Sequence, residues 1–130
     1  MTTWRWIDRE TVLAVHEEQL SEHGGLVGVR DSGGLDAALA RPLNKAAYDH
    51  EIGVYTLAAA YAFGLTKAHA FSDGNKRTAA VVMELFLELN GFVLNATDTE
   101  LLPIHLALAA GEIDESALSD WLEANCTAIS

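Results

Sequence analysis

The sequence predicts an all-α fold, a bundle of about six helices with a short β-hairpin or flap near residues 24–34. Two segments, residues 51–67 and 78–89, are apolar on nearly every face, as expected for helices at the centre of a bundle. A short polar segment, residues 69–77, separates them, so they are expected to pack as antiparallel neighbours. Capping residues and glycines divide the rest of the chain into further helices of ordinary length.

The N-terminal part of the chain predicts a short strand followed by a helix. Residues 4–7 alternate between large apolar and other side chains, which is typical of a small strand. Asp8 is a suitable N-cap, and the helix after it is expected to reach about Glu22 and to stop at the two glycines 24–25. Two histidines of this helix lack a partner at metal-ligand spacing and are expected at the surface: His16 and His23.

Residues 24–34 are rich in glycine and contain a β-like stretch at 26–29. They match neither of the common glycine-rich phosphate motifs, so the residues alone are compatible with a flexible loop. An exposed strand edge here is also suited to pair with an extended peptide. Residues 35–41 then predict a short helix that ends at Pro42.

The two apolar segments predict the central helices of the bundle. Residues 43–50 form a connection in which Asp49 is a candidate cap for a helix that begins at Glu51. The second central helix is expected to begin at about Asn75 and to close at residues 90–91, which are Asn-Gly.

A fifth helix is expected after a short connection. Thr97 or Asp98 is suited to cap it. Because Pro103 falls within its first turns, the regular part is expected to run from about Leu102 to near Gly111.

The last predicted helix begins at the cap Asp114. Ile113 and Leu118 are spaced as a hydrophobic staple around this cap, and Leu122 belongs to the buried face. The tail, residues 126–130, is expected to fray.

Composition narrows the classes of function. The 130 residues are expected to form one domain, and the single cysteine, Cys126, excludes an internal disulfide and fits a reducing compartment. We expect a cytoplasmic protein, because the chain begins without a signal-peptide pattern and lacks an apolar run of membrane-spanning length. The net charge of −11 argues against direct nucleic-acid binding. Three of the eight Lys and Arg residues nevertheless fall within residues 67–77, so positive charge is concentrated at one polar loop.

The residue types in this loop indicate phosphate chemistry. The start of a helix presents free N–H groups and a partial positive charge, which attract anions. Lys76 and Arg77 add two full charges where a purely structural helix start would favour Asp or Glu. Asp73 is a hard oxygen ligand suited to Mg²⁺, and His69 can accept a proton near neutral pH. Phe71, the one large apolar residue of the loop, is expected to anchor it in the core.

The loop resembles the signature of the Fic/Doc superfamily, and its Doc branch in particular. The matching pattern is H-x-F-x-D-G-N-K-R, in which seven of nine positions are defined. The branch of the superfamily that transfers AMP usually has glycine where this chain has Lys76. The segments 29–42 and 86–92 are similar to Doc proteins as well. The matching positions are His69, Phe71, Asp73, Gly74, Asn75, Lys76 and Arg77.

The resemblance implies a Fic fold and a toxin that acts as a protein kinase. Doc proteins transfer the γ-phosphate of ATP to a threonine of elongation factor Tu, which halts translation. By this resemblance His69 is the general base, Lys76 and Arg77 act on the phosphates together with the N–H groups of residues 74–76, and Asp73 holds Mg²⁺. The flap beside the active site that docks the target is expected at these residues: Val27, Gly28, Val29, Arg30 and Asp31.

The resemblance also implies control by a second protein. No Glu in the sequence is followed by Gly or Asn, as the inhibitory motif of self-restrained Fic proteins requires. Inhibition by an antitoxin in trans is therefore expected. Two other functions stay open from the sequence: AMP transfer to a protein hydroxyl, and a non-catalytic module that binds nucleotide or a partner.

Overall fold

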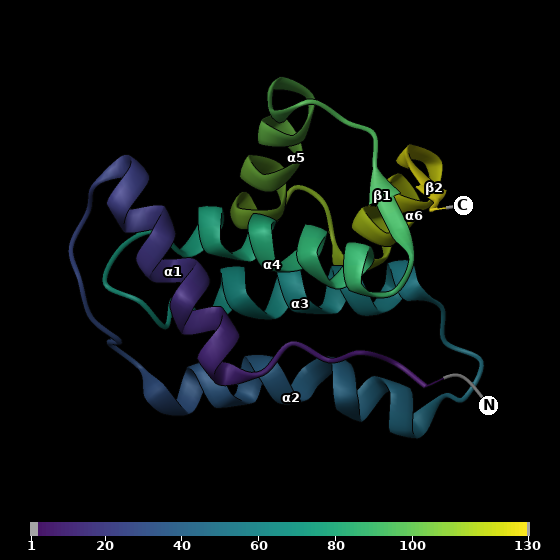
Figure 1. The fold of residues 1–130 in the computed structure, drawn as a ribbon, viewed down its shortest axis with the longest axis horizontal. Helices are drawn as coiled ribbons and strands as arrows, with labels where there is room; N and C mark the ends of the chain where they lie inside the picture. Colours follow the sequence, from purple (N-terminus) through teal and green to yellow (C-terminus); the bar gives the residue numbers. More distant parts are fainter. Residues whose placement is uncertain (1–2, 130) are drawn as a thin grey trace.

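A computed structural model describes residues 3–129 and shows six helices and two short strands (Figure 1). The helices are α1 (Arg9–His23), α2 (Ser32–Tyr48), α3 (Val54–Ala68), α4 (Asn75–Leu89), α5 (Asp98–Ala110) and α6 (Glu115–Asn125). The strands are β1 (Phe92–Leu94) and β2 (Cys126–Ala128). The predicted all-α class with about six helices is confirmed. The antiparallel strands are not at residues 24–34, so the predicted position of the β-hairpin is wrong.

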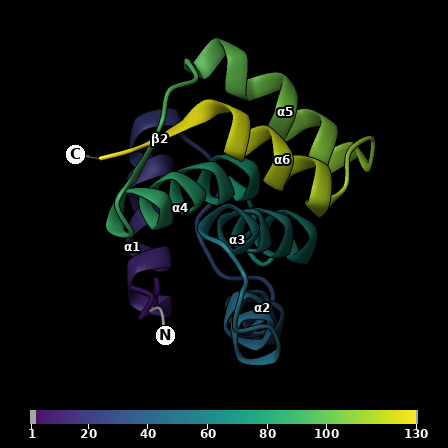
Figure 2. The same cartoon turned by 90° about the vertical axis from the view of Figure 1, so that its right-hand side faces the viewer.

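The α3 helix lies at the centre of the bundle (Figure 2). It packs against α4, α2 and α6, and its residues 57–62 are completely buried. Small side chains allow the close approach of its neighbours: a Cβ added at Gly64 would lie 3.2 Å from the carbonyl oxygen of Ala38 in α2. The N-terminal segment is fixed to α3 as well, because the Tyr61 hydroxyl accepts a hydrogen bond of 2.9 Å from the backbone N–H of Ile7.

The α2 helix is longer than the sequence predicts. It continues through Pro42 to Tyr48, so the predicted end at Pro42 is wrong. Proline removes one backbone hydrogen bond from a helix interior, but Pro42 is buried and its packing offsets part of that cost. Asp49 ends α2 instead of beginning α3, whose N-cap is Gly53, so the predicted role of Asp49 is wrong as well.

Side-chain caps fix the starts of four helices. The predicted caps of α1, α5 and α6 are confirmed, and that of α5 forms a complete capping box with Glu100. Because of this box, α5 begins at Asp98 and tolerates Pro103 inside it, so the expected later start near Leu102 is wrong. The four caps are Asp8, Asp31, Thr97 and Asp114.

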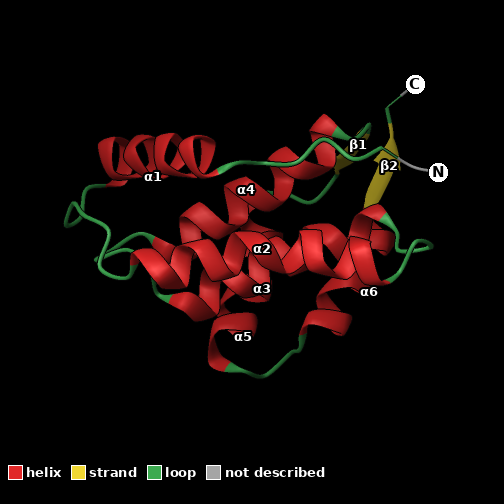
Figure 3. Cartoon of the chain, turned by 90° about the horizontal axis from the view of Figure 1, so that it is seen from below, coloured by secondary structure: helices red, strands yellow, loops and turns green. Residues whose placement is uncertain are grey.

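The paired strands lie away from residues 24–34 (Figure 3). Strand β1 pairs antiparallel with β2, with Val93 opposite Thr127, so residues 126–128 of the tail expected to fray are held in a sheet; Ser130 lies outside the described residues. Residues 24–31 form an extended segment with one isolated bridge, Val29 to Phe71, rather than a hairpin. The segment 4–7 is also extended without being a strand.

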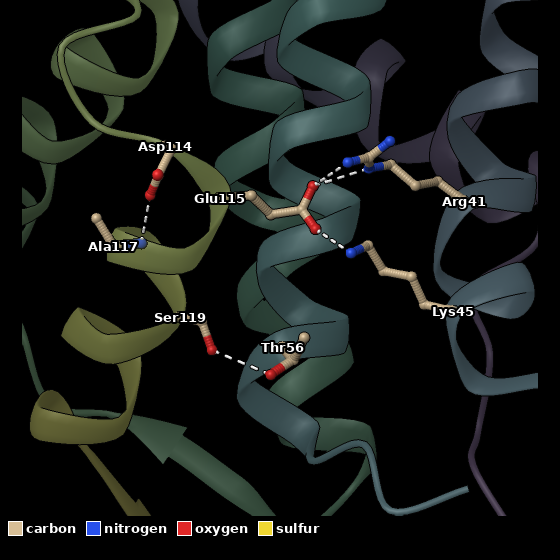
Figure 4. A network of polar contacts seen from close by, with 7 residues as sticks. All are labelled: Arg41, Lys45, Thr56, Asp114, Glu115, Ala117 and Ser119. Atoms are coloured by element: carbon tan, nitrogen blue, oxygen red, sulfur yellow. Dashed lines mark hydrogen bonds and ion pairs between the residues drawn. The ribbon is translucent and has the colours of Figure 1, made fainter. Parts of the chain in front are cut away.

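An ion-pair cluster links α2 to α6 across α3 (Figure 4). Glu115 accepts from Arg41 at 2.6 Å and from Lys45 at 2.8 Å, and its side chain is only 14% exposed. Partial burial reduces screening of these pairs by water and salt. The cluster therefore holds the last helix against the bundle.

None of the helices within residues 3–129 is long and apolar enough to cross a membrane.

Candidate functional site

The polar loop joins the C-terminal end of α3 to the N-terminal end of α4, at one end of the central helix pair. Phe71 is only 2% exposed and belongs to the core, in the position that the sequence analysis expects for an anchor. The side chain of Asn75 fixes the loop around it: Oδ1 accepts from the N–H of Phe71, and Nδ2 donates to its carbonyl oxygen, both at 3.0 Å. The Asn75 amide therefore shapes the loop, and its backbone N–H is left to contact a ligand.

His69 lies at the junction of α3 and the loop, with its side chain exposed. It ends α3 in the left-handed conformation, with φ 46° and ψ 44°. Among residues 3–129 it is the only residue other than glycine with a positive φ. This conformation costs a non-glycine residue about 1–2 kcal/mol. Residues held in such strain concentrate at functional sites, which fits a role for the imidazole.

The start of α4 lacks the cap that four other helices have. Its N-cap is Gly74, in the left-handed conformation, and no side chain of residues 3–129 caps it. The first turn has no acidic residue but contains Lys76, which is exposed, and Arg77, which is half-buried. An uncapped helix start next to two cations has the charge and the free N–H groups that favour an anion, which makes this turn the candidate site.

Asp73 lies at the surface of the same turn. Its Oδ1 accepts from the N–H of Gly74 at 2.8 Å, so this N–H is already engaged, and the groups left for a ligand belong to Asn75 and Lys76. The other oxygen, Oδ2, faces Gly25: a Cβ built there would lie 2.8 Å from it. Glycine is favoured at position 25, because its φ of 133° is rare for other residues and a Cβ would displace the carboxylate.

Arg77 contacts the segment that follows α1. Its Nη2 donates to the carbonyl oxygen of Gly24 at 3.2 Å, and its Nε is buried without an acceptor in residues 3–129. The guanidinium is therefore held near the turn with hydrogen-bonding capacity unused.

The expected flap runs along the outside of the loop. The Ser72 N–H donates to the carbonyl oxygen of Gly28 at 3.1 Å, and the N–H groups of Arg30 and Asp31 donate to that of Ala70 at 2.7 and 3.0 Å. Arg30 also donates from Nη2 to the carbonyl oxygen of His69 at 2.9 Å.

The flap residues have different roles in this arrangement. The side chain of Val27 is 81% exposed and that of Val29 is 41% exposed. The Asp31 carboxylate caps α2 by accepting from the N–H of Gly34 at 2.8 Å. The segment is thus bonded to the loop on one side and presents apolar side chains to solvent.

The sequence analysis missed His16. This residue of α1 was expected at the surface, but it is only 5% exposed, so that expectation is wrong. Its ring stacks on Phe71, with centroids 3.8 Å apart, and its Nε2 lies 2.8 Å from the carbonyl oxygen of Asp73. A signal was present: Val12, His16 and Leu20 are spaced by four and lie on one face of the helix, which is buried.

Two clefts of the described surface lie elsewhere. One of about 680 Å³ is lined by Lys45, Tyr48 and Thr56, among others, and another of about 440 Å³ by Arg41 and Glu115. Neither cleft is lined by a residue of the polar loop, which follows the last residue of α3. Their basic side chains, Arg41 and Lys45, are engaged in the ion pairs with Glu115. The polar loop is therefore the candidate site on chemical grounds.

Comparison with known proteins places this site in a family. The sequence model of the Fic/DOC family matches residues 6–87. The chain belongs to the Fic/DOC family. The match covers α1 to α4 and therefore includes the loop, the flap and His16, whereas α5, α6 and both strands lie outside it.

Two relatives belong to the Doc branch that the loop predicts. "Protein kinase doc" of Escherichia phage P1 is 35% identical over 118 residues, which cover 91% of this chain and 93% of the relative. "Toxin Doc" of Mycolicibacterium smegmatis is 41% identical over 92 residues, which cover 70% of this chain and 68% of the relative. The predicted membership of the Fic/Doc superfamily, with similarity to Doc toxins, is confirmed.

Proposed function

We propose that this protein is a toxin of the Doc type that transfers the γ-phosphate of ATP to a serine or threonine hydroxyl of a translation factor, and thereby stops growth. The observation that carries the proposal is the start of α4, which has no side-chain cap and carries Lys76 and Arg77 in its first turn. The name of the relative from phage P1 supports kinase chemistry. Elongation factor Tu is the proposed target, through the resemblance to Doc proteins.

The phosphates bind at this turn. The backbone N–H groups of Asn75 and Lys76 point out of the helix start, and the Lys76 ammonium and the Arg77 guanidinium neutralise the phosphate oxygens. Lys76 also places a long cationic side chain where AMP-transferring relatives have glycine. A phosphate cannot occupy that space in the same way, so the nucleotide is bound with its γ-phosphate presented for transfer.

His69 is the general base. It removes the proton from the attacking hydroxyl as the new oxygen–phosphorus bond forms and the bond between the γ-phosphorus and the bridging oxygen breaks. ADP is the leaving group, and the proton taken by the imidazole is released to solvent. Because the ring is exposed at the edge of the loop, a protein hydroxyl can reach it.

Mg²⁺ fits the donor set at Asp73. The Asp73 carboxylate is exposed and is a hard oxygen donor. Within residues 3–129 no group of three or more His, Cys, Asp or Glu side chains could hold a metal ion. We therefore propose that Asp73 holds Mg²⁺ together with phosphate oxygens and water. When bound, the ion supplies charge neutralisation for the transferred group.

The flap holds the target beside the histidine. Residues 28–31 use one side to bond the loop, while Val27 and Val29 present apolar side chains to solvent. An extended segment of the target is proposed to pair with this strip through backbone hydrogen bonds. A toxin of this kind requires restraint, and we propose that an antitoxin supplies it in trans, as the resemblance to Doc proteins implies.

The decisive experiment uses ATP labelled at the α or the γ position, incubated with Mg²⁺, purified elongation factor Tu and this protein. Label retained on protein from the γ position alone supports the kinase. Label retained from the α position replaces it with AMP transfer. If neither label is retained and expression does not arrest growth, the chain is a non-catalytic binding module.

Two variants test the assignment of the base. His69→Ala should abolish transfer and leave the dissociation constant of Mg·ATP nearly unchanged, because the imidazole acts on the hydroxyl and not on the nucleotide. His50→Ala, at an exposed position near the far end of α3, is the matched control and should retain full transfer. Turnover that survived His69→Ala would exclude the general-base role.

A further inference from the structure

We infer that His16 is a positioning residue, which holds the phosphate-binding turn in shape from the neighbouring helix α1. The inference deepens the proposed function and rests on it for its catalytic consequence. Its basis is that one buried side chain contacts two parts of the loop: the Phe71 ring at 3.8 Å between centroids, with planes 10° apart, and the carbonyl oxygen of Asp73 at 2.8 Å. Burial of the side chain alone does not explain these two contacts.

The hydrogen bond fixes which ring nitrogen carries the proton. A carbonyl oxygen only accepts, so Nε2 of His16 must be the donor. This bond holds the plane of the peptide between Asp73 and Gly74, immediately before α4. Rotation of that plane would displace the Gly74 N–H, which the Asp73 carboxylate binds at 2.8 Å. His16 therefore sets the orientation of the carboxylate and of the first turn together.

The rest of α1 makes the support rigid. Val12 and Leu20, one turn before and one turn after His16, are buried on the same face. Leu20 also packs against both glycines of the site: a Cβ added at Gly25 would lie 2.9 Å from it, and one at Gly74 would lie 3.6 Å from it. A side chain fixed on a packed helix positions a loop more accurately than a side chain on another loop does.

Two substitutions separate the hydrogen bond from simple filling of space. His16→Phe keeps an aromatic ring against Phe71 and removes the donor, whereas His16→Gln places an N–H near the former Nε2 and removes the ring. We expect His16→Phe to weaken Mg·ATP binding by about tenfold, the effect of losing roughly one hydrogen bond. His16→Gln should bind within about threefold of the original protein. Equal affinity of His16→Phe and the original protein, or an equal loss in both variants, would overturn the inference.

Two further measurements test the inference, and the first uses the unmodified protein, so it is independent of the folding of the variants. Nitrogen-15 NMR of the His16 ring should show the proton on Nε2, and a neutral ring with its proton on Nδ1 would overturn the inference. Hydrogen exchange of the Gly74 amide should accelerate in His16→Phe and stay slow in His16→Gln. Unchanged exchange in His16→Phe would count against a positioning role.

The same measurements distinguish failure of this inference from failure of the kinase proposal. If the original protein binds Mg·ATP but labels no protein, the kinase proposal fails. The Mg·ATP affinity of the variants, the tautomer of the His16 ring and the hydrogen exchange of the Gly74 amide still test the positioning role. If transfer proceeds and His16→Phe matches the original protein in affinity and exchange, the kinase proposal stands and the inference on His16 falls.

Discussion

His105 in α5 should make the stability of the fold sensitive to mild acid. The residue is only 5% exposed, and neither ring nitrogen has a hydrogen-bond partner among residues 3–129. Burial disfavours the charged ring and lowers the pKa of His105 from 6.5 to about 4. In the unfolded chain the same ring titrates near its ordinary value, so the two states bind different numbers of protons over this interval.

The sign and size of the effect follow from linkage. Between pH 6.5 and pH 4 the ring of His105 is protonated in the unfolded chain but neutral in the folded protein. The free energy of unfolding is therefore highest above pH 6.5 and decreases as the pH falls toward 4. For a pKa difference of this size, the free energy of unfolding falls by about 2 kcal/mol between pH 7 and pH 5 and by about 3 kcal/mol by pH 4. Losses of this size are a large fraction of the stability of a small domain.

The substitution His105→Leu isolates this contribution. Leucine has a similar volume and no polar atom to bury, so at pH 7 the variant should be more stable by about 1–3 kcal/mol. Urea unfolding at pH 7 and pH 5, followed by circular dichroism, measures both states. The advantage of the variant should grow by about 2 kcal/mol between the two pH values, because carboxylate titration affects both proteins alike.

His50→Leu is the matched control, because His50 is exposed and its substitution should leave the pH dependence of unfolding unchanged. Two results would refute the reasoning on His105. One is a constant difference between His105→Leu and the original protein from pH 7 to pH 5. The other is a variant less stable than the original protein at pH 7, which would mean that the ring is hydrogen-bonded in the folded state.

Three further predictions concern other positions. Gly25→Ala places a Cβ 2.8 Å from the Asp73 carboxylate and should raise the Mg²⁺ concentration needed for transfer, whereas Gly53→Ala, at a negative φ and with nothing within 4 Å, should leave it unchanged; equal values would contradict the contact. Burial, and to a lesser extent the charges of nearby carboxylates, raises the pKa of Glu84. Glu84→Gln should therefore raise the midpoint of urea unfolding at pH 7, and this increase should become smaller at lower pH; a midpoint below that of the original protein would refute the reasoning. Burial raises the pKa of Cys126 from 9.0 to about 11, so at pH 8 iodoacetamide should modify it about 100-fold more slowly than an ordinary thiol; rapid labelling would count against a buried thiol.

The sequence predicted the parts of the fold that depend on local chemistry. The caps Asp8, Thr97 and Asp114 are recognised because a short polar side chain satisfies an N–H two or three residues later, without help from the rest of the chain. The central helices are recognised because they are apolar on nearly every face. The loop between them is recognised because it combines a histidine, a carboxylate and two adjacent cations at a helix start, which is unusual for a purely structural turn.

The parts that escaped prediction depend on contacts between distant segments. His16 shares a helix face with Val12 and Leu20, but it is polar, and its partners Phe71 and Asp73 lie more than fifty residues away, so the local spacing alone does not identify its contacts. Pro42 would end an isolated helix, but packing of α2 on α3 overrides the local preference. The pairing of Val93 with Thr127 also depends on tertiary contacts, and no short-range sequence pattern predicts it.

The structure also explains why the site sits at the start of α4 and not at another helix. Of the two helices without a side-chain cap, α3 begins at Gly53 and has no cation in its first turn, whereas α4 begins beside two cations, in contact with α1 and the segment after it. The carboxylate that could have capped α4, Asp73, instead binds the N–H of Gly74 and leaves the next two N–H groups free. The missing cap and the two cations destabilise this turn. A bound anion stabilises it, because its negative charge interacts favourably with the helix start and with both cations. Nucleotide binding should therefore raise the melting temperature, and should do so less in a variant that removes the charge of Lys76.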